Sequence, residues 1–379
     1  MKYMSVAAMT VAALLLATAS PATAAGAIAV GDVQQAMEKL AETPGIVGAI
    51  GGAYVDGKLA GRGTAGSRLL NGKGGTILAD SRFRIGSQSK VMVATVLLQL
   101  VEKGKLGLDD KLADLLPEVA ADGLVAQADK ITVQQLVQHT SGIPDWFYEG
   151  DSTEPAFDVF DFTTYYRPID IVKMTRGRPR TGKPGEKFTY SNTNFTLIGM
   201  IIEKVTGHTL AGELNGRLFR PLGMTLTYMA TKPPEGIEGP HGHGYYPDSA
   251  GILRDVDRFN ASWGNGAGGV ISTTRDVSTF QRAFDQGKLL PPWLQEILTG
   301  GPGGGAQQGG GQQGGSRKRA GQCEGDMRIQ GGSAPGYTTL ILYSTDGRQQ
   351  FEMSVTRSTA DDSVVIPAMA KAGEAVLCP

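Results

Sequence analysis

The sequence predicts an α+β fold, in which an antiparallel sheet built from N- and C-terminal segments is flanked by helices and carries an inserted, mainly helical domain. Strand-like apolar runs occur near both ends of the 379-residue chain, and helical patterns flank them. Between them, residues 109–258 show helical patterns broken by Pro, Gly and Asp turns. We therefore expect residues 25–108 and 259–379 to form one α/β sheet domain and residues 109–258 a helical domain.

The N-terminal part of the sheet domain is predicted to begin with a helix and to continue as a hairpin. Residues 32–42 repeat apolar positions with helical spacing. An apolar run at residues 46–55 is followed by a shorter one around Leu59, and Asp56-Gly57 between them is typical of a tight hairpin turn. These residues therefore predict one helix and two paired strands.

A long helix and a C-terminal group of elements complete the sheet domain. Residues 87–103 have an amphipathic helical pattern that ends at Gly104. Residues 337–344 and 351–356 are apolar and rich in β-branched or aromatic side chains, which predicts a second pair of strands. Residues 363–377 then predict a closing helix.

The first residues predict export. Lys2 precedes a short apolar run at residues 6–18, and Ala-Thr-Ala at residues 22–24 offers small side chains at the spacing of a signal-peptide cleavage site. The apolar run is too short to span a bilayer. We therefore expect residues 1–24 to be a signal peptide and the mature protein to be secreted, without a membrane anchor.

The charge balance argues against polyanionic partners. The chain has 36 basic and 37 acidic residues, a formal net charge of -1, and 41% hydrophobic residues. A nearly neutral chain gives no electrostatic reason to bind nucleic acid or an anionic membrane surface. We expect a monomer that acts on a small molecule or peptide.

Two features near the C-terminus stand apart from the globular pattern. Cys323 and Cys378 are the two cysteines of the chain, and in an oxidising compartment they most simply form a disulfide. Residues 300–322 contain an almost pure Gly and Gln run, which cannot bury apolar surface and predicts a loop or linker.

The first candidate catalytic motif opens the helix at residues 87–103. Ser87 and Lys90 are three residues apart and therefore lie on one helical face, where hydroxyl and amine can meet. The partial positive charge of the helix N-terminus favours a developing serine alkoxide. A weak hydroxyl nucleophile needs such an activating partner. The alternative interpretation is a capping serine beside a surface lysine.

Two further motifs offer groups that suit acyl transfer. Tyr190-Ser191-Asn192 lies in a polar turn before a predicted helix, where Tyr190 could move a proton and Asn192 could bind a substrate amide. The Gln-Gly-Gly-Ser sequence at residues 330–333 leads into the strand at 337–344. Its glycines allow a close approach to a ligand, and a backbone N–H there could serve an oxyanion hole.

Taken together, the three motifs resemble those of serine penicillin-binding proteins and β-lactamases. The tyrosine in the second motif resembles class C β-lactamases and the soluble, exported D-alanyl-D-alanine carboxypeptidases, to which the likeness is greatest. The resemblance extends over most of the mature chain and includes residues 139–144, 190–195, 202–208 and 268–276. It implies a β-lactamase/transpeptidase-like fold.

The resemblance also implies roles for single residues. Ser87 matches the acylated serine, Lys90 its activating partner, and Tyr190 the general acid/base that protonates the leaving group. Asn192 matches the amide-binding residue. The N–H groups of Ser87 and Ser333 match the oxyanion hole.

Four more positions belong to the expected substrate site. Trp263 resembles a wall of the cleft, although a buried aromatic is the equal alternative. Arg317 stands where a relative places an arginine for the terminal carboxylate, although a linker residue competes with that interpretation. Gln330 and Gly332 belong to the third motif, and Gln330 replaces the Lys or His usual in the family. This replacement predicts an altered rate rather than inactivity.

Other site types find little support. A Ser-His-Asp hydrolase needs a Gly-x-Ser-x-Gly elbow, which does not occur. His241 and His243 form a loop pair without carboxylate or cysteine company in the sequence, which favours an incidental pair over a metal site. Residues 264–269 lack the Lys-Ser/Thr of a phosphate loop. We therefore expect no metal and no organic cofactor.

The sequence thus predicts an exported serine hydrolase that cleaves D-alanyl-D-alanine peptides of cell-wall precursors through an acyl-enzyme on Ser87. The alternatives are a class C-like β-lactamase, a serine esterase or a D-amino-acid amidase, because one scaffold hosts several activities. A non-catalytic protein that binds cell-wall peptides or β-lactams is the alternative from another class.

Overall fold

The computed structural model of the protein describes residues 28–150, 152, 154–300 and 327–379. The predicted signal peptide therefore lies outside the described residues, as does most of the Gly/Gln run. The described helices are α1 (Val33–Ala41), α2 (Ser89–Glu102), α3 (Leu112–Leu115), α4 (Pro117–Ala120), α5 (Val133–Val137), α6 (Pro168–Lys173), α7 (Asn192–Thr206), α8 (Leu210–Leu214), α9 (Ala261–Gly268), α10 (Thr274–Asp285), α11 (Pro292–Thr299) and α12 (Asp362–Leu377).

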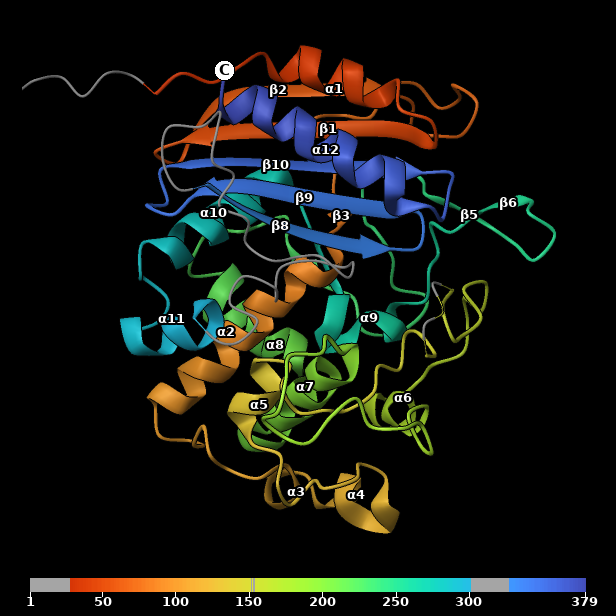
Figure 1. The fold of residues 1–379 in the computed structure, drawn as a ribbon. Helices are drawn as coiled ribbons and strands as arrows, with labels where there is room; N and C mark the ends of the chain where they lie inside the picture. Colours follow the sequence, from red (N-terminus) through yellow and green to blue (C-terminus); the bar gives the residue numbers. More distant parts are fainter. Residues whose placement is uncertain (1–27, 151, 153, 301–326) are drawn as a thin grey trace, which may run out of the picture.

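A five-stranded antiparallel sheet, in the order β2-β1-β10-β9-β8, forms one layer of the molecule (Figure 1). Its strands are β1 (Ile46–Val55), β2 (Lys58–Gly66), β8 (Met327–Ala334), β9 (Tyr337–Ser344) and β10 (Gln349–Arg357). Short strands form two smaller sheets: β3 (Phe83–Arg84), β4 (Tyr228–Met229) and β7 (Val270–Ser272) in one, β5 (Tyr245–Pro247) and β6 (Leu253–Asp255) in the other.

The predicted union of the two chain ends in one sheet is confirmed. Strand β1 from the N-terminal hairpin pairs with β10 from the C-terminal part, so that Ala49 lies opposite Val355. Both strands are buried along nearly their whole length, because helices cover the sheet on each side (Figure 1). The two ends of the chain thereby build a single rigid support.

Helices α1 and α12 cover the outer face of this sheet (Figure 1). Helix α1 begins after Asp32, whose carboxylate accepts from Gln35 N at 3.0 Å. Its buried side chain Met37 and the α12 residue Met369 join Phe351 and Met353 of β10 in one apolar cluster. The outer layer is thus held by burial of apolar surface between helix and sheet.

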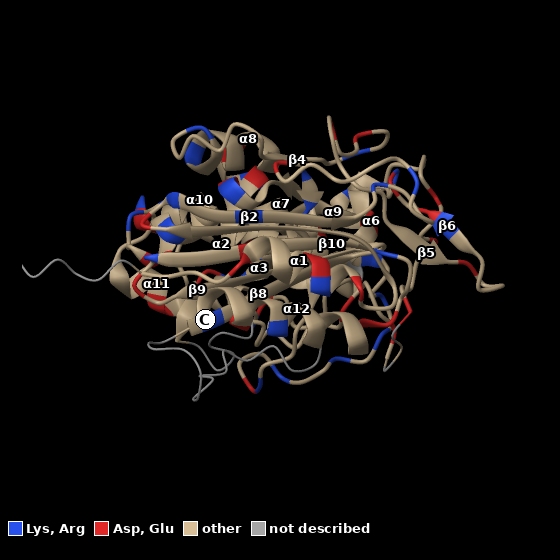
Figure 2. Ribbon diagram, turned by 90° about the horizontal axis from the view of Figure 1, so that it is seen from above, with Lys and Arg blue, Asp and Glu red and all other residues tan. Residues whose placement is uncertain are grey.

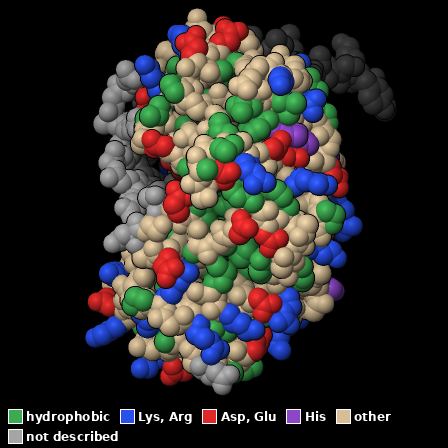
Figure 3. All heavy atoms as spheres, turned by 90° about the vertical axis from the view of Figure 1, so that its right-hand side faces the viewer, with side chains coloured by type: hydrophobic (Ala, Val, Ile, Leu, Met, Phe, Trp, Pro, Cys, Tyr) green, Lys and Arg blue, Asp and Glu red, His purple; other side chains and the backbone are tan. Residues whose placement is uncertain are grey.

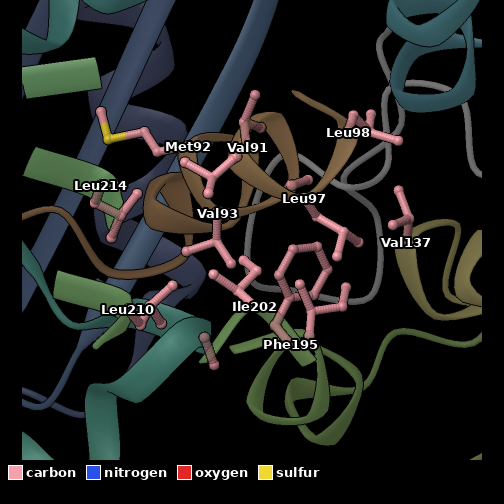
Figure 4. Packing of buried hydrophobic residues seen from close by; sticks show 14 of the residues in the cluster. Val91, Met92, Val93, Leu97, Leu98, Val137, Phe195, Ile202, Leu210 and Leu214 are labelled. Carbon is pink, nitrogen blue, oxygen red and sulfur yellow. The ribbon is translucent and has the colours of Figure 1, made fainter. Parts of the chain in front are cut away.

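The other face of the sheet rests on a larger group of helices, with α2 at its centre. Figure 4 shows Val93 and Leu97 of α2 directed toward Phe195 and Ile202 of α7, with Leu210 of α8 beside them. These side chains belong to one continuous buried cluster that also includes residues of α5, α10 and α11. Because α2 is packed on nearly all sides, the residues at its N-terminal end are held in fixed positions.

Seen from above, the charged side chains do not form a surface that is mainly positive or mainly negative. Figure 2 shows Lys and Arg interspersed with Asp and Glu around the periphery, while the central strands carry few charges. Among the described residues, no helix is long and apolar enough to cross a membrane.

Candidate active site

Ser87 lies in a tight turn at the N-terminal end of α2. It is the middle residue of the 3-10 turn Gly86–Gln88, and α2 follows directly. The turn is anchored to the small sheet, because Ile85 N donates to Val270 O of β7 at 3.1 Å. Ser87 is only 9% exposed. Its hydroxyl is therefore held at a helix N-terminus, where developing negative charge is favoured.

Lys90 lies one helical turn further on and is fully buried. Its Nζ donates to Ser87 Oγ at 3.0 Å, to Asn192 Oδ1 at 2.8 Å and to Ala267 O at 2.6 Å. Burial lowers the pKa of Lys90 to about 7, and the nearby charge of Asp145 opposes this shift only in part. An amine with this pKa is available in its neutral form near neutral pH.

Tyr190 approaches Ser87 from the other side. Its Oη lies 2.7 Å from Ser87 Oγ, and its ring centroid lies 5.0 Å from Lys90 Nζ. Burial raises the pKa of Tyr190 above its ordinary value, and the hydrogen bond with Ser87 compensates only in part. Tyr190 is therefore a neutral phenol at neutral pH, able to donate a proton.

His139 supports the Tyr190 ring rather than taking part in proton transfer. The two rings are stacked, with centroids 4.6 Å apart. Burial and the Lys90 charge lower the pKa of His139 to about 3, so that the imidazole is neutral. Its Nδ1 accepts from Ser191 N at 3.1 Å. His139 thus fixes the segment that carries the second motif.

Asn192 is the first residue of α7, three residues before Phe195, where the sequence predicted the helix to begin. Its backbone N donates to Asp145 Oδ1 at 3.1 Å and its Nδ2 donates to Asp145 Oδ2 at 2.9 Å. Since Asn192 Oδ1 accepts from Lys90, both ends of the amide are engaged within the protein. The predicted binding of a substrate amide by Asn192 would use the second hydrogen of Nδ2 and stays a prediction.

Sequence reasoning missed Asp145 and the carbonyl of Ala267. Asp145 is partly buried and directly follows residues 139–144, which resemble a family segment. A backbone carbonyl has no sequence signal at all. The available signal for Asp145 was therefore its position beside a family segment.

The third motif lies on a strand of its own, which corrects the expectation that it merely leads into residues 337–344. Strand β8 pairs with β9 and places Ser333 opposite Thr338. The glycines weaken the local strand signal, but they allow β8 to touch the nucleophile turn. A Cβ on Gly332 would lie 2.0 Å from Ile85 O and 2.9 Å from Ser87 N, and one on Gly86 would lie 2.6 Å from Ser333 N. The Ser87 and Ser333 amides are thereby neighbours.

Comparison with known proteins accounts for this arrangement. Residues 33–371 match the sequence model of the family described as Beta-lactamase. The chain belongs to that family. It is a serine hydrolase of the β-lactamase and penicillin-binding protein superfamily, with the β-lactamase/transpeptidase-like fold that the sequence predicted.

Two curated relatives of this β-lactamase family member are penicillin-binding proteins. Penicillin-binding protein 4 of Amycolatopsis lactamdurans is 31% identical over 257 residues, which cover 66% of this chain and 62% of the relative. Penicillin-binding protein 4* of Bacillus subtilis (strain 168) is 28% identical over 316 residues, which cover 79% and 65%. The chain thus spans less than two thirds of the length of either relative.

Two of the solved structures of similar fold are an amidohydrolase and an amidase. A D-stereospecific amidohydrolase from Streptomyces sp. has a TM-score of 0.69 and 28% identity, covering 89% of this chain and 97% of that one. The D-amino acid amidase from Ochrobactrum anthropi SV3, complexed with L-phenylalanine amide, has a TM-score of 0.68 at 21% identity, with coverage of 90% and 97%. The second likeness is one of fold alone.

Two of the remaining predicted site residues are buried beside the β-lactamase-family motifs. Gln330 of β8 is 2% exposed, and its Nε2 has no hydrogen-bond partner within the described part of the chain. Trp263 is 4% exposed and stacks on Phe157 and Tyr166, with ring centroids 4.3 Å and 4.2 Å away. Trp263 is thus a buried aromatic, and its role as a wall of the cleft stays a prediction.

Three predictions cannot be placed. Arg317 and Cys323 lie outside the described residues, so that the carboxylate-binding role of Arg317 and the disulfide between Cys323 and Cys378 stay predictions. The loop or linker predicted for the Gly/Gln run also falls almost entirely on residues outside the described part, and β8, which follows it, is one of the two edge strands of the described sheet.

Proposed function

We propose that this chain is an exported serine peptidase that cleaves D-alanyl-D-alanine peptides through an acyl-enzyme on Ser87. The observation that carries the proposal is the position of Ser87 Oγ, 3.0 Å from the fully buried Lys90 Nζ and 2.7 Å from Oη of the partly buried Tyr190. The peptide substrate is supported by the penicillin-binding relatives. Export is supported by the pattern of residues 1–24.

Lys90 is the base that activates Ser87. A neutral amine has two N–H groups, which match its two other acceptors, Asn192 Oδ1 and Ala267 O. Its lone pair is then directed at Ser87 Oγ and can accept the hydroxyl proton as Oγ attacks the substrate carbonyl. The low pKa of Lys90, caused by burial, populates this form near neutral pH.

A Tyr190 phenolate is disfavoured as the base that activates Ser87, because burial raises the pKa of Tyr190. Tyr190 instead donates its proton to the leaving nitrogen when the tetrahedral intermediate collapses. The N–H groups of Ser87 and Ser333 stabilise the oxyanion before this step. The acyl-enzyme then holds a protonated Lys90 beside a Tyr190 phenolate, and the positive charge of Lys90, 5.0 Å from the ring centroid, stabilises the phenolate that burial alone disfavours.

Deacylation reverses these proton transfers. The Tyr190 phenolate takes a proton from water as the water oxygen attacks the ester carbonyl, and protonated Lys90 returns its proton to Ser87 Oγ as that oxygen leaves. The carboxylic acid product is released and the free enzyme is restored. Each group thus serves once as acid and once as base.

D-amino-acid amides are the second candidate substrate. The Streptomyces D-stereospecific amidohydrolase is 28% identical and matches over 97% of its length, which is more complete coverage than either penicillin-binding relative offers. Both candidates present a D-configured residue at the scissile amide. A class C-like β-lactamase and a serine esterase use the same Ser87 chemistry.

The proposal is tested by intact mass spectrometry of the mature protein mixed with benzylpenicillin, with Ser87→Ala as control. A lasting adduct that requires Ser87 supports slow deacylation of the drug, as expected of a carboxypeptidase. Rapid drug loss without an adduct would replace it with a β-lactamase. If neither an adduct nor drug loss appears, the remaining candidates are an esterase, an amidase and the non-catalytic binding protein.

The natural acyl donor is then separated by turnover assays. Release of D-alanine from a D-alanyl-D-alanine peptide is compared with release of ammonia from D-phenylalanine amide and D-alanine amide, always with Ser87→Ala in parallel. Faster turnover of the amides would assign the second candidate. Turnover of no acyl donor by a protein that binds the peptide would favour the non-catalytic alternative.

A further inference from the structure

The His241 cluster, which consists of His241, His243, Asp255 and Asp257, lies outside the Ser87 site. The two histidines precede β5, and the two carboxylates lie at and just after the end of β6. Figure 3 shows histidine side chains beside acidic ones on the upper part of the face that carries these strands. The two histidines have no neighbouring carboxylate in the sequence, but the β5–β6 hairpin brings Asp255 and Asp257 back to them in the fold.

The local backbone directs both imidazoles to the same side. In extended chain, residues two apart project from the same face, whereas Gly242 between them faces the opposite side. There is no room for a side chain there, because a Cβ on Gly242 would lie 2.5 Å from Ile77 Cδ1. Arg68 fixes the segment, since His243 N donates to Arg68 O at 2.9 Å and Arg68 Nε donates to His241 O at 3.2 Å.

The imidazoles are held as metal-binding histidines are held. His241 Nδ1 lies 2.6 Å from Gly239 O, and His243 Nδ1 lies 2.7 Å from Asp255 Oδ2. A histidine that binds a metal typically donates its other ring N–H to a carbonyl or a carboxylate in this way. Both rings thus keep Nε2 for a ligand, and they are parallel, with centroids 5.3 Å apart and an interplanar angle of 5°.

A third ligand completes the set. His241 Nε2 faces Asp257 Oδ1 at 2.8 Å. When His241 Nδ1 carries a proton and donates it to Gly239 O, Nε2 of the neutral ring is an acceptor, as is Asp257 Oδ1. Two acceptors this close need a proton or a cation between them. His241, His243 and Asp257 each offer a ligand atom, and these atoms all lie within 4.8 Å of one another.

We propose that His241, His243 and Asp257 bind a divalent transition metal of the zinc type, with Asp255 and the Gly239 carbonyl orienting the two imidazoles. Imidazole nitrogen and carboxylate oxygen suit zinc and its neighbours. Two ligand atoms bound to tetrahedral zinc lie about 3.3 Å apart. The 2.8 Å between His241 Nε2 and Asp257 Oδ1 therefore has to widen by roughly 0.5 Å when the ion replaces the proton between them.

The ion would join the β5–β6 hairpin to the loop that precedes it. The hairpin already contacts the base of the third-motif strands: Val256 N donates to Gly244 O at 2.9 Å, and a Cβ on Gly244 would lie 2.4 Å from Gly336 O. Gly336 lies in the turn between β8 and β9. Metal binding would thus stabilise the region that supports β8 without contributing an atom to the Ser87 chemistry.

The test is isothermal titration calorimetry of the metal-free mature protein with ZnCl2, and with CoCl2 as a spectroscopic probe. We expect one site per chain and an intense visible Co²⁺ absorption typical of low coordination number. His241→Gln and His243→Gln are each expected to lower zinc affinity by roughly 100-fold or more, since even outer partners of a ligand matter by 10- to 100-fold. Asp255→Asn is expected to lower zinc affinity by about 10- to 100-fold, because Asp255 orients His243 without binding the metal.

His208→Gln is the matched control. His208 is an exposed histidine whose Nδ1 lies 2.8 Å from Glu213 Oε1, so it tests whether any His–carboxylate pair binds zinc. Its zinc affinity should equal that of the wild type. Thermal unfolding without metal verifies that each variant folds, and Asp257→Asn replaces any histidine variant that does not. The proposal is overturned if zinc fails to bind the folded wild type, or if binding persists unchanged in folded Asp257→Asn and both histidine variants.

Discussion

Asp145 accepts two hydrogen bonds from Asn192, one from the backbone N at 3.1 Å and one from Nδ2 at 2.9 Å. This contact fixes the amide of Asn192 so that its Oδ1 faces Lys90 Nζ. Asp145 also affects Lys90 through its charge, which opposes the fall in the pKa of Lys90 that burial causes. One partly buried carboxylate thus controls both the position and the protonation of the base.

Replacement of Asp145 by Ala should therefore lower the acylation rate by about 10- to 100-fold, the scale expected for a misplaced catalytic group. The midpoint of the pH–rate profile should also move to lower pH, because the charge that favours protonated Lys90 is gone. Stopped-flow acylation by a chromogenic β-lactam measures both effects. Asp158→Asn is the control, since Asp158, like Asp145, accepts from the backbone N two residues on. If the midpoint of the pH–rate profile does not shift, the charge of Asp145 has no effect on Lys90 and Asp145 has only a structural role.

Acylation by the wild type should rise with pH through about 7, because Lys90 acts as a base and its pKa is lowered to about 7. Below that value, each pH unit should change the rate by about tenfold, and above it the rate should level off. Tyr190 produces no fall near neutrality, because burial raises its pKa and keeps it protonated. Lys90→Arg, which cannot deprotonate, should lose at least about 100-fold. A rate that falls between pH 6 and 8 would contradict this assignment.

The part of the site predicted from the sequence is the part with local or family signals. Ser87 and Lys90 are joined by helical spacing alone, whereas Tyr190 is 103 residues from Ser87 and needed the family resemblance. Asp145 had no signal of its own, because a single carboxylate in a turn is most often exposed. Its function depends on burial, which only the fold creates.

The strands of the sheet were likewise predicted only where the local sequence carries a clear strand signal. Strands β1 and β9 are largely apolar, β10 alternates apolar and polar residues, and all three were predicted within a few residues. Strand β8 was missed because glycine weakens the strand signal. The carboxylates of the His241 cluster were missed for a topological reason. They lie more than ten residues after His241 and return through a hairpin of two three-residue strands.

Gly332→Ala should nearly abolish acylation. The added Cβ would lie 2.0 Å from Ile85 O and 2.9 Å from Ser87 N, so β8 must move away from the nucleophile turn. We expect a loss of about 100-fold or more, as for removal of an oxyanion donor, and about 1–3 kcal/mol of destabilisation. Gly216→Ala is the control, because nothing lies within 4 Å of its added Cβ. Normal acylation by Gly332→Ala would show that β8 does not form the oxyanion site.

Gln330→His should raise the acylation rate by about tenfold, less than a complete general acid/base contributes, because Lys90 and Tyr190 already transfer the protons. Gln330 is buried in β8 and its Nε2 lacks a partner among the described residues, so an imidazole of similar size can replace it and add a titrating group. The measurement is the pH–rate profile of acylation beside the wild type. An unchanged rate at every pH would deny this position a special role.

Glu352 offers a prediction about stability rather than rate. It is fully buried in β10 behind the nucleophile turn, and its Oε2 accepts from Gln88 Nε2 at 3.3 Å while Oε1 has no partner within the described residues. Burial therefore raises the pKa of Glu352 well above its usual value. Between the unfolded and folded pKa values the folded state binds one proton more than the unfolded state, so stability falls as pH rises, by about 1.4 kcal/mol per pH unit.

Glu352→Gln removes this proton uptake and keeps a side chain that can bond to Gln88. Its free energy of unfolding should exceed that of the wild type at pH 8 and should depend less on pH above 5, as urea unfolding at several pH values measures. Glu213→Gln is a comparison variant for which the expected change in the free energy of unfolding has the opposite sign. Burial alone would raise the pKa of Glu213, but hydrogen bonds from Arg217 and His208 hold it below its usual value, so Glu213 stabilises the fold above pH 4 to 5. Glu213→Gln should therefore lose stability at neutral pH, and equal pH slopes for wild type and Glu352→Gln would show that Glu352 folds as an anion.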